Sequence, residues 1–474
     1  MIALFIFLNI YFVSFKDKPE KTAPQLSPRA VEQRAKWNIP TDEMDYPVST
    51  MYLNEVSKAG GKVHHVSRWF NGATVEMDET TAAKVEGLSF VTDVEMTRDD
   101  DSVNYGPRKQ KKMPLWQASE LTNDDTDAQL NLYDLLPLHN EGFEGQGILM
   151  TVCDGGFYKA NTLSCFRQKQ ELGHFDFTDD DKYGYTFYGN KGTHGTECLS
   201  TITGIQDGYY GAATKADYYL MRSEEEDTES PKEMDNLVAA LEKSDSLGVN
   251  VFSVSLGYAE FDNEEWTLDK TTDLDGKTTR SSRAALIAAR KGMLVCVAAG
   301  NEGNDPWGTI SSPGDADSIL TVGAVDVNGI IGDFSSYGPS SDGRIKPEVC
   351  AVGKQATLIH PNGSITHSNG TSFATPLLAG LAASLWSALP NENAMQIRER
   401  IIRSADRYNN PDTQDYKNGY GIPDAWKAYT MDTPQGIEDT KSQEPDARKI
   451  IRNRQVVIIR GGERYTIMGL KIEE

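Results

Sequence analysis

Three short segments of the sequence place an acid, an imidazole and a hydroxyl in settings that suit nucleophilic catalysis. GILMTVCDGGF puts Asp154 at the end of an apolar run, GTHGTECLSTITG puts His194 at the start of a small-residue helix, and SNGTSFATPLLAG puts Ser372 at the start of a long apolar helix. A serine hydroxyl is a weak nucleophile until a base takes its proton. A carboxylate can hold an imidazole in the tautomer that leaves its second nitrogen free as that base. These residue types predict acyl transfer.

The sequence also supplies candidate donors for the oxyanion that forms in such a reaction. Ser372 lies at the N-terminus of a predicted helix, which offers free N–H groups and positive potential. Asn301 directly follows the apolar run LVCVAAG, and we expect its side-chain amide to donate to the oxyanion. Glycines beside His194 and Ser372 let a substrate backbone approach closely.

These segments resemble those of the subtilisin-like serine proteases, the subtilases. Residues 370–376 match the family's Gly-Thr-Ser-x-Ala-x-Pro, residues 194–196 its His-Gly-Thr, and residues 299–301 its oxyanion segment. The chain order of Asp, His and Ser is that of subtilisin. The resemblance covers about residues 115–430. It implies a catalytic triad of Asp154, His194 and Ser372, with Asn301 as the oxyanion donor.

One residue beside the expected triad departs from the family pattern. Subtilases usually have Ser or Thr after the catalytic aspartate, whereas this sequence has Gly155. The change removes one hydroxyl near the carboxylate of Asp154. We expect a modest effect, because the carboxylate itself remains.

The resemblance further implies where a substrate binds. Two segments match the family's substrate-binding segments: Ser255-Leu256-Gly257 and Ala298-Ala299-Gly300. An extended peptide would add to the first through backbone hydrogen bonds. The second would form a wall of the primary specificity pocket, whose small residues permit a large apolar side chain. Ser311 and Glu302 are candidates to reach the base of that pocket.

The elements that position these residues alternate between strands and helices. Short apolar runs predict strands, and periodic segments predict helices; the strands are 148–153, 218–221, 249–253, 294–298 and 319–325, and the helices 232–247 and 281–291. Continuous apolar strands that alternate with helices indicate an α/β fold, a mostly parallel sheet with helices on both faces. We assign residues 110–432 to this domain. The motifs fall just after the strands, where such sheets bind ligands.

A smaller α+β pattern precedes this domain. Helical spacing at 47–59 and 80–86 and alternation at 63–69, 73–77 and 90–96 predict two helices and three strands. We assign residues 25–100 to this domain and interpret 25–40 as a linker. The unit resembles subtilase propeptides, which act as folding chaperones and inhibitors; an unrelated N-terminal domain is the alternative. The charged stretch at 98–112 predicts an exposed, cleavable connection, so we expect a self-processed zymogen.

The first residues form an apolar segment, IALFIFLNIYFVSF at residues 2–15. Its length suits the core of a secretory signal peptide, so we predict a signal peptide over residues 1–18 and a secreted or cell-surface protein. A basic segment before the core and a clear cleavage site are missing, so the true start lies upstream or the site is atypical. The alternative is a buried strand or helix at the start of a domain.

The tail is assigned to residues 440–474. Its part from Lys449 to Ile472 is basic and alternates, and Gly461-Gly462 predicts a hairpin turn. Segments such as SRWFNGATVEM and DGRIKPEV are similar to those of bacterial subtilases of the Bacteroidetes. The tail resembles the sorting domains that those bacteria use with the type IX secretion system, which makes secretion machinery a candidate partner. A terminal hairpin packed on the protease is the alternative.

The composition of the chain excludes one class of binding partner. The formal net charge of −23 argues against a nucleic-acid partner, which needs a positive surface. We expect a monomer that acts on protein or peptide substrates and needs no organic cofactor. Asp273 and Asp275 lie in an acidic insertion that is either a solvated loop or part of a structural calcium site. Cys198, one helical turn after His194, is a packing residue or has a redox or metal role.

Two other functions remain open on the same fold. A transpeptidase would need its acyl-enzyme shielded from water, usually by an extra helical cap, and the sequence has no such insertion. A catalytically inactive binding protein would not need the intact Asp154, His194, Asn301 and Ser372. The sequence therefore favours a serine endopeptidase.

Overall fold

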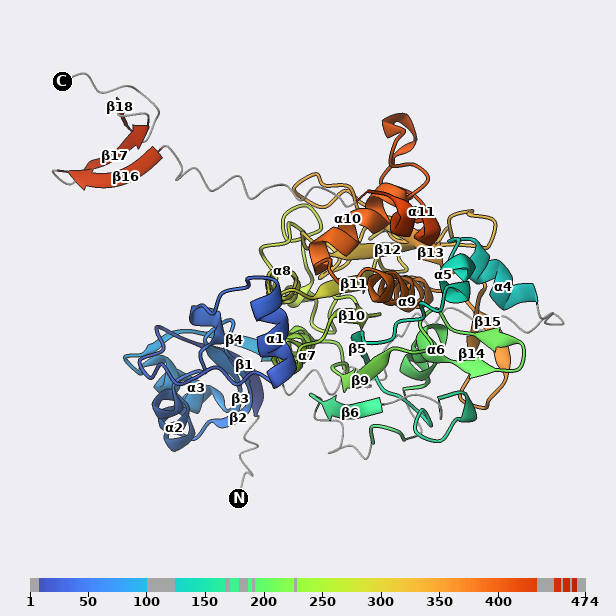
Figure 1. Ribbon diagram of the computed structural model, residues 1–474. Helices are drawn as coiled ribbons and strands as arrows, with labels where there is room; N and C mark the ends of the chain where they lie inside the picture. Colours follow the sequence, from blue (N-terminus) through green and yellow to red (C-terminus); the bar gives the residue numbers. More distant parts are fainter. Residues whose placement is uncertain are drawn as a thin grey trace. The chain divides into compact units, whose positions relative to one another are not determined.

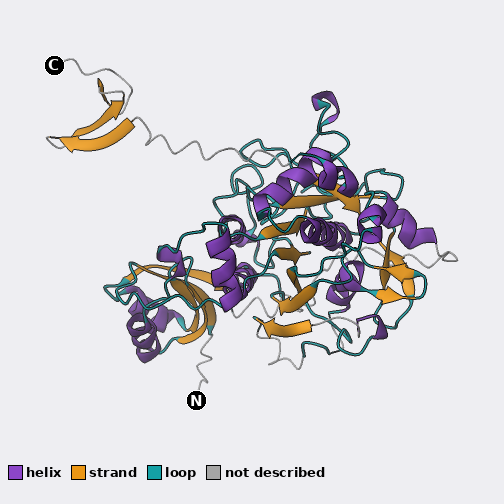
Figure 2. Ribbon diagram, viewed as in Figure 1, coloured by secondary structure: helices purple, strands orange, loops and turns teal. Residues whose placement is uncertain are grey.

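The computed structural model describes residues 8–99, 124–166, 171–178, 186–189, 192–225 and 228–432, together with three strands of the tail. The chain divides into a larger unit, Met1–Met431, and a smaller one, Asp432–Glu474. The larger unit holds an N-terminal four-stranded sheet and a seven-stranded sheet (Figure 1 and Figure 2).

The seven-stranded sheet is parallel throughout, with the order β13-β12-β11-β10-β5-β9-β6. Its strands are β5 (Leu149–Asp154), β6 (Glu171–Asp176), β9 (Asp217–Arg222), β10 (Val251–Val254), β11 (Leu294–Ala298), β12 (Leu320–Val325) and β13 (Val349–Val352). After β5 the chain builds β6 and β9 on one side and β10 to β13 on the other, so the strand order reverses beside β5. Ligands bind at the carboxyl edge of such a reversal.

Helices cover both faces of this sheet, which confirms the predicted fold class. They are α6 (Thr193–Thr203), α7 (Lys232–Leu247), α8 (Arg280–Arg290) and α9 (Thr371–Ala388). Successive strand residues point to opposite faces. Met150 and Val152 of β5 therefore join the core formed with α6 and α9. Leu149 and Cys153 join the core formed with α7 and α8, which lie on the side of the N-terminal sheet in Figure 1.

The N-terminal sheet is antiparallel, with the order β2-β3-β1-β4. Its elements are β1 (Asn9–Phe15), α1 (Pro28–Lys36), α2 (Thr50–Ala59), β2 (Lys62–Ser67), β3 (Gly72–Met77), α3 (Glu79–Glu86) and β4 (Val91–Arg98). Apart from α1, this is the β-α-β-β-α-β arrangement of ferredoxin-like domains. Tyr11, Val13, Val56, Val75 and Val85 share its core.

The first strand corrects the prediction of a signal peptide over residues 1–18. β1 lies inside the sheet, pairs with both β3 and β4, and leaves Val13 fully buried. Removal of residues 9–15 would therefore take out an interior strand, so this apolar segment is part of the domain. The prediction was wrong here because the length and apolarity of such a run suit a signal core and an interior strand equally. Residues 1–7 lie outside the described part of the chain.

The expected linker at 25–40 also differs from the structure. It contains α1, which begins after Ser27, whose side chain accepts a hydrogen bond from the Ala30 N–H. The helix packs on α7, as Figure 1 shows. Its buried face carries Ala30 and Arg34 instead of an apolar stripe, so the hydrophobic pattern gave no sign of it.

The remaining helices and strands complete the two units. In the larger unit they are α4 (Asp124–Asn131), α5 (Leu136–Asn140), β7 (Ile205–Gln206), β8 (Tyr209–Tyr210), β14 (Ala356–Ile359), β15 (Ile365–Ser368), α10 (Ala394–Ser404) and α11 (Ala425–Thr430). The tail has three antiparallel strands, β16 (Ala447–Arg452), β17 (Gln455–Arg460) and β18 (Glu463–Thr466). Arg460 pairs with Glu463, whereas the predicted turn at Gly461-Gly462 lies outside the described residues. None of the helices in the described residues is long and apolar enough to cross a membrane.

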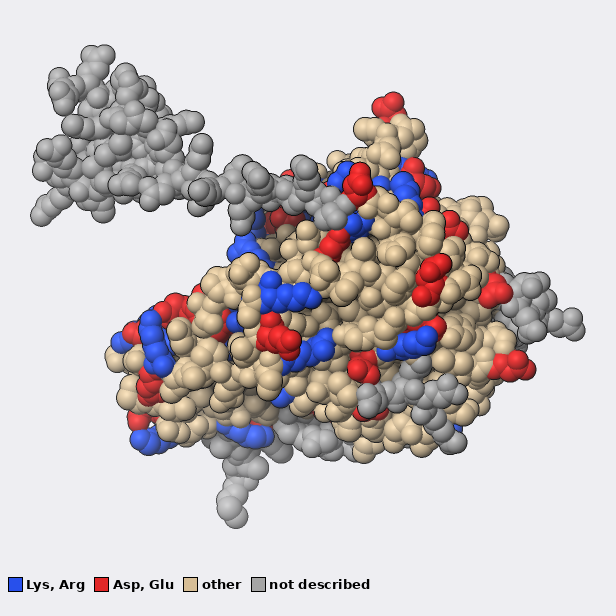
Figure 3. All heavy atoms as spheres, viewed as in Figure 1, with Lys and Arg blue, Asp and Glu red and all other residues tan. Residues whose placement is uncertain are grey.

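The surface is mixed in charge. On the face drawn in Figure 3, Lys and Arg side chains are interspersed with Asp and Glu. That face therefore offers no basic stripe of the kind that follows a nucleic-acid backbone.

Candidate active site

The three residues predicted to do chemistry meet at the carboxyl edge of the large sheet. Asp154 is the last residue of β5, His194 the second residue of α6 and Ser372 the second residue of α9. Each side chain is therefore fixed by the end of a regular element, and β5 is the strand beside which the sheet order reverses.

Two glycines let α6 begin close against the end of β5. A Cβ on Gly195 would lie 2.3 Å from the carbonyl oxygen of Gly156 and 2.9 Å from the Cβ of Asp154. A side chain there would force α6 away from β5 and separate His194 from Asp154. Gly192, which precedes α6, has a left-handed backbone with φ of 77° that favours glycine. The glycines around His194 are thus needed for the close approach of α6 to the end of β5.

The imidazole of His194 is held by a buried carboxylate. Its Nδ1 lies 2.9 Å from Oδ1 and 3.0 Å from Oδ2 of Asp154, whose side chain is only 1% exposed. The Gly155 N–H donates to the same Oδ1 at 2.8 Å, so this carboxylate has a backbone donor although residue 155 has no hydroxyl. With the proton on Nδ1, Nε2 is left as a base, and the side chain of His194 is 38% exposed.

Ser372 lies in the first turn of α9, and hydrogen bonds hold its backbone carbonyl in place. Its carbonyl oxygen accepts hydrogen bonds from Ser255 Oγ at 2.7 Å and from Cys198 Sγ at 3.2 Å. Its own hydroxyl donates to the carbonyl oxygen of Ser255 at 3.4 Å. Among the hydrogen bonds of the described residues, none joins this hydroxyl to His194; in enzymes without substrate such bonds are often long and tighten in the complex.

Asn301 is oriented by the residue before Ser372. Its Oδ1 accepts hydrogen bonds from the Thr371 N–H at 2.9 Å and from Thr371 Oγ1 at 3.1 Å. Because the amide oxygen of Asn301 faces Thr371, the Nδ2 atom and its two N–H groups point away from Thr371. The sequence singled out Asn301 but not this role of Thr371, although Thr371 belongs to the serine motif.

The surroundings of His194 favour its protonated form. Burial is the largest influence and lowers the pKa of the imidazole, but the charge and hydrogen bond of Asp154 together with the interactions of Cys198 outweigh it and hold that pKa well above its ordinary value. A base must be neutral to accept a proton, so this site is expected to work best on the alkaline side.

Cys198 lies beneath the site. Its Sγ is 3.8 Å from His194 Nδ1 and donates to the backbone of Ser372. Burial raises the pKa of its thiol to about 11, so it is a thiol at neutral pH. Ligand atoms of Asp154, His194 and Cys198 lie within 4.8 Å of one another, which is a spacing that a metal ion could bridge. The hydrogen bond to Ser372 favours a positioning role for Cys198.

Sequence comparison agrees with this geometry. A family model described as "Subtilase family" matches residues 145–421, more than half of the chain. The chain belongs to the subtilase family. It is a serine endopeptidase, as members of this peptidase family S8 are. A second model, "Peptidase S8 propeptide domain, Bacteroidota", matches residues 10–114, so the N-terminal sheet of this subtilase is a propeptide domain.

Known proteases and solved structures are similar to this chain. Subtilisin DY from Bacillus licheniformis is 28% identical over 271 residues, which span 56% of this chain and 86% of the relative. The thermostable alkaline protease of Halalkalibacterium halodurans is 26% identical over 358 residues, 73% of this chain and 88% of the relative. The structure of the prenylagaramide maturation protease PagA is 25% identical, with a TM-score of 0.50, and covers 62% of this chain and 98% of its own. MycP1 from Mycobacterium smegmatis, 22% identical with a TM-score of 0.55 over 70% of this chain and 91% of its own, shows the fold.

The two predicted substrate-binding segments of this subtilase end in Gly257 and Gly300. A Cβ on Gly257 would lie 2.9 Å from the Cβ of Ser311, and a Cβ on Gly300 would lie 3.3 Å from Ser311 Oγ and 2.5 Å from Glu302 Oε2. Ser311 therefore lies against both segments and Glu302 against the second. The sequence did not indicate Ser336, whose hydroxyl donates to Glu302 Oε2 at 2.9 Å and fixes that carboxylate.

The acidic insertion proposed for calcium uses its carboxylates within its own loop. Asp275 Oδ1 accepts from the N–H groups of Lys277 and Thr278, at 2.7 and 2.8 Å, and Asp273 Oδ2 accepts from the Asp269 N–H at 2.8 Å. These hydrogen bonds are typical of turns. Calcium binding by this loop stays a prediction.

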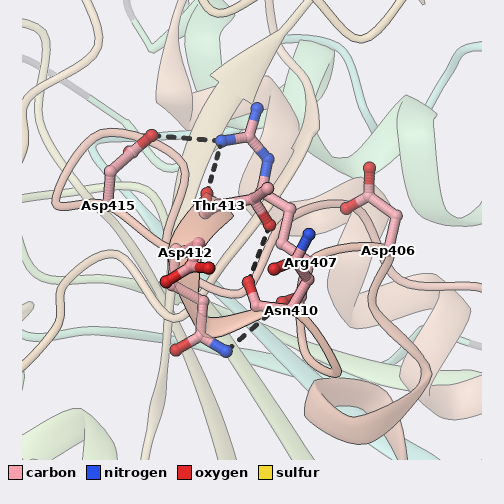
Figure 4. A pocket seen from close by; sticks show the side chains of 7 residues that line it. Asp406, Arg407, Asn410, Asp412, Thr413 and Asp415 are labelled. Atoms are coloured by element: carbon pink, nitrogen blue, oxygen red, sulfur yellow. Dashed lines mark hydrogen bonds and ion pairs between the residues drawn. The ribbon is translucent and has the colours of Figure 1, made fainter.

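A separate hollow of about 510 Å³ lies between α10 and α11 in the sequence (Figure 4). Its lining residues are Asp406, Arg407, Asn410, Asp412, Thr413, Gln414 and Asp415. Arg407 donates to Asp415 Oδ2 at 3.0 Å and to the Thr413 carbonyl at 2.9 Å. These polar groups hold their own loop together, and none of the lining residues belongs to the motifs of this subtilase.

Proposed function

We propose that this subtilase hydrolyses peptide bonds with Asp154, His194 and Ser372 as its triad. His194 Nε2 takes the proton of Ser372 Oγ as that oxygen attacks the carbonyl carbon of the substrate. The C–N bond then breaks, and His194 gives the proton to the leaving amine. Water attacks the acyl-enzyme by the same route. The observation that carries this proposal is the hydrogen bond of His194 Nδ1 to the buried Asp154 carboxylate, because it leaves Nε2 as the base.

The oxyanion of each tetrahedral intermediate would be stabilised by Asn301 Nδ2 and by the N-terminus of α9. Thr371 holds the amide oxygen of Asn301, which leaves the amide nitrogen as donor. Donors fixed in this way need no reorganisation as charge develops. No organic cofactor is needed for this chemistry.

We infer that a substrate binds as an extended strand along Ser255, Leu256 and Gly257. Such a peptide pairs through main-chain hydrogen bonds. Its side chain at the cleaved bond would lie between that segment and the wall formed by Ala298, Ala299 and Gly300. Glu302 and Ser311, which lie against these segments, are placed to affect the choice of side chain.

We further propose that the enzyme is made as a zymogen that processes itself. The propeptide domain docks on α7, where the buried carboxylate of Glu242 accepts hydrogen bonds from Ser67 Oγ at 2.5 Å, the Arg68 N–H at 3.0 Å and the Trp69 N–H at 3.2 Å. These donors come from the last residue of β2 and the turn that follows it. They satisfy a carboxylate that would otherwise be costly to bury.

The propeptide strand β4 ends close to the carboxyl edge that carries the triad. Arg98, its last residue, forms an ion pair of 2.6 Å with Glu225, which follows β9 by three residues. The strand β4 thus ends on the side of the sheet that carries the triad. We propose that it is cut between about residues 98 and 115, a stretch of which all but the first two residues lie outside the described part of the chain.

We propose that the enzyme is exported and acts outside the cell. Support comes from the propeptide, which keeps a protease covered until it is processed, since the apolar segment at 9–15 is a strand and lends no support. The tail strands β16 to β18 are proposed as a sorting signal. Cell fractionation of the full chain and of a variant without residues 440–474 tests both proposals. We expect the full chain in the medium and the shortened variant to be missing from it. Both proteins confined to the cytoplasm would contradict export.

A covalent probe tests the central proposal. Processed enzyme should react with a fluorophosphonate at Ser372, and mass spectrometry of the labelled peptide should locate the adduct. Ser372→Ala protein should remain unlabelled. Ser368→Ala, a change at the end of β15 four residues earlier, serves as the matched control. Equal labelling of wild type and Ser372→Ala would contradict the assignment of the nucleophile.

A further inference from the structure

A buried carboxylate in the segment after β9 already holds a basic side chain. Glu225 accepts hydrogen bonds at Oε2 from Arg98 Nη1 at 2.6 Å and from Thr228 Oγ1 at 3.1 Å, and Lys232 contacts its Oε1. The side chains of Arg98 and Glu225 are only 10% and 3% exposed. A carboxylate buried in this way needs charged partners, because an uncompensated charge in the interior is costly. Glu225 is therefore the centre of a built site for a basic side chain.

One of the two cations at this site belongs to the propeptide. Arg98 precedes the proposed cut between residues 98 and 115, so it lies on the amino side of the bond that is cleaved. When the propeptide leaves, the mature protease keeps Glu225 and Lys232 but loses the cation at Oε2. Among the described residues of the stretch 223–233, four glutamates then accompany one cation, Lys232. This excess of negative charge favours another guanidinium or ammonium group at the position of Arg98.

The position of Arg98 lies beside the segment along which we infer that a substrate binds. Glu225 follows β9 and the substrate-binding residues 255–257 follow β10, and β5 separates these two strands in the sheet. A Cβ on Gly155, the neighbour of Asp154 at the end of β5, would lie 3.8 Å from the Cβ of Glu224. The acidic segment after β9 and the substrate segment after β10 therefore lie on either side of the end of β5.

The acidic segment is also joined to the chain that follows the substrate segment. The Glu229 N–H donates to Asp262 Oδ2 at 2.8 Å, and the Asp262 N–H donates to the Glu229 carbonyl at 2.9 Å. Tyr258, the next residue after the substrate segment, is fully buried. Burial raises the pKa of its hydroxyl, and nearby carboxylates, among them Glu224 and Glu229, raise it further. A peptide extended along the substrate segment therefore lies in a negative potential.

We propose that the mature protease selects substrates with an arginine or lysine on the amino side of the cleaved bond, and that Glu225 and Glu224 bind this side chain where Arg98 lies in the zymogen. The proposal rests on the proposed function and names the substrate class of the same site. It concerns a residue before the one that enters the pocket at the cleaved bond. The connection that the enzyme is to cut has the same chemistry, because it contains the basic run RKQKK at residues 108–112.

The test compares matched peptides on processed enzyme. Internally quenched peptides share one large apolar residue at the cleaved bond and carry either arginine or glutamine, in turn, at each position before it. The ratio of kcat/KM for the arginine peptide to that for its glutamine counterpart is measured in about 0.05 M and about 0.5 M KCl. Glu225→Gln and Glu224→Gln remove the proposed charges. Glu141→Gln, at an exposed glutamate that ends α5, is the matched control.

At one position at least, wild type and Glu141→Gln should favour arginine by about 10- to 100-fold, mainly through KM, because a hydrogen bond between charged groups contributes that much. Added salt should weaken this preference. Glu225→Gln should lower the ratio by about tenfold or more. If Glu225→Gln hinders maturation, Glu224→Gln and the salt series on wild type still decide. Equal kcat/KM for all arginine and glutamine pairs at low salt would overturn the proposal, whereas failure of wild type to react with a fluorophosphonate would overturn the proposed function.

Discussion

Asp154→Asn tests how the site sets the protonation of His194. The Gly155 N–H donates to Oδ1 at 2.8 Å, so the amide oxygen of the introduced asparagine must take the Oδ1 position to accept it. The amide NH₂ then takes the Oδ2 position, 3.0 Å from His194 Nδ1. An N–H on Nδ1 would lie 2.9 Å from the amide oxygen but also 3.0 Å from the amide nitrogen, a second donor, whereas a bare Nδ1 accepts a hydrogen bond from that NH₂. The variant therefore favours the tautomer with the proton on Nε2, which is no longer a base.

The expected loss is large. In another serine protease fold the same change keeps the geometry and lowers kcat by about 10⁴-fold, because the tautomer is wrong. At 1.36 kcal/mol for each factor of ten, this is about 5.4 kcal/mol of activation free energy. The substitution also removes the charge that raises the pKa of His194 most strongly against the effect of burial, so that pKa should fall from its raised value.

The measurement is kcat and KM on a peptide p-nitroanilide between pH 6 and 10, with processed enzyme. We expect kcat to fall by about 10⁴-fold with KM little changed. Asp317→Asn is the control, since Asp317 is exposed and accepts from the Ser318 N–H. A loss of less than about tenfold would refute the reasoning that the carboxylate fixes the tautomer of His194.

Further predictions follow from the same site. Asn301→Ala should lower kcat by about 10²–10³-fold and leave KM nearly unchanged, because its amide meets charge present only in the transition state; an effect on KM alone would assign Asn301 to ground-state binding. In wild type, kcat/KM should rise with pH through the raised pKa of His194, since the protonated ring that prevails below it cannot act as base; a flat profile from pH 5 to 9 counts against a histidine base. Ser372→Ala should abolish casein hydrolysis, as removal of this serine lowers turnover about 2 × 10⁶-fold in subtilisin itself, and intact-mass analysis should find it uncut; processing at the wild-type rate would exclude self-cleavage.

The sequence predicted the large sheet well because its strands are continuous apolar runs. It missed β6, whose residues are alternately half-buried and exposed, as at a sheet edge with one covered face. It missed β13, which has only four residues and follows a Pro-rich stretch. The apolar run of β1 was assigned to a signal peptide, and the polar, proline-containing stretch that holds α1 was interpreted as a linker. In both cases the partner that gives the segment its structure lies far along the chain.

For the site, the motifs supplied residue types and order, whereas the contacts came from the fold. His194 and Cys198 are four residues apart, but the hydrogen bond from Cys198 to the carbonyl of Ser372 joins residues 174 apart in sequence. The role of Thr371 in turning the amide of Asn301 likewise depends on α9 starting beside the end of β11. Residue spacing alone contains no information on such pairs.

The segment at residues 27–46, which contains α1, limits the order in which contacts of the chain can form. The propeptide sheet is complete once Arg98 has been synthesised, but Arg34 meets Asp245, 211 residues later, and Asp45 meets Lys291, 246 residues later. Contacts of such separation form late, because closing a long loop costs entropy before the contact repays it. These contacts cannot form before α8 and Lys291 have been synthesised, so docking of the propeptide through these residues comes after the whole propeptide sequence is complete.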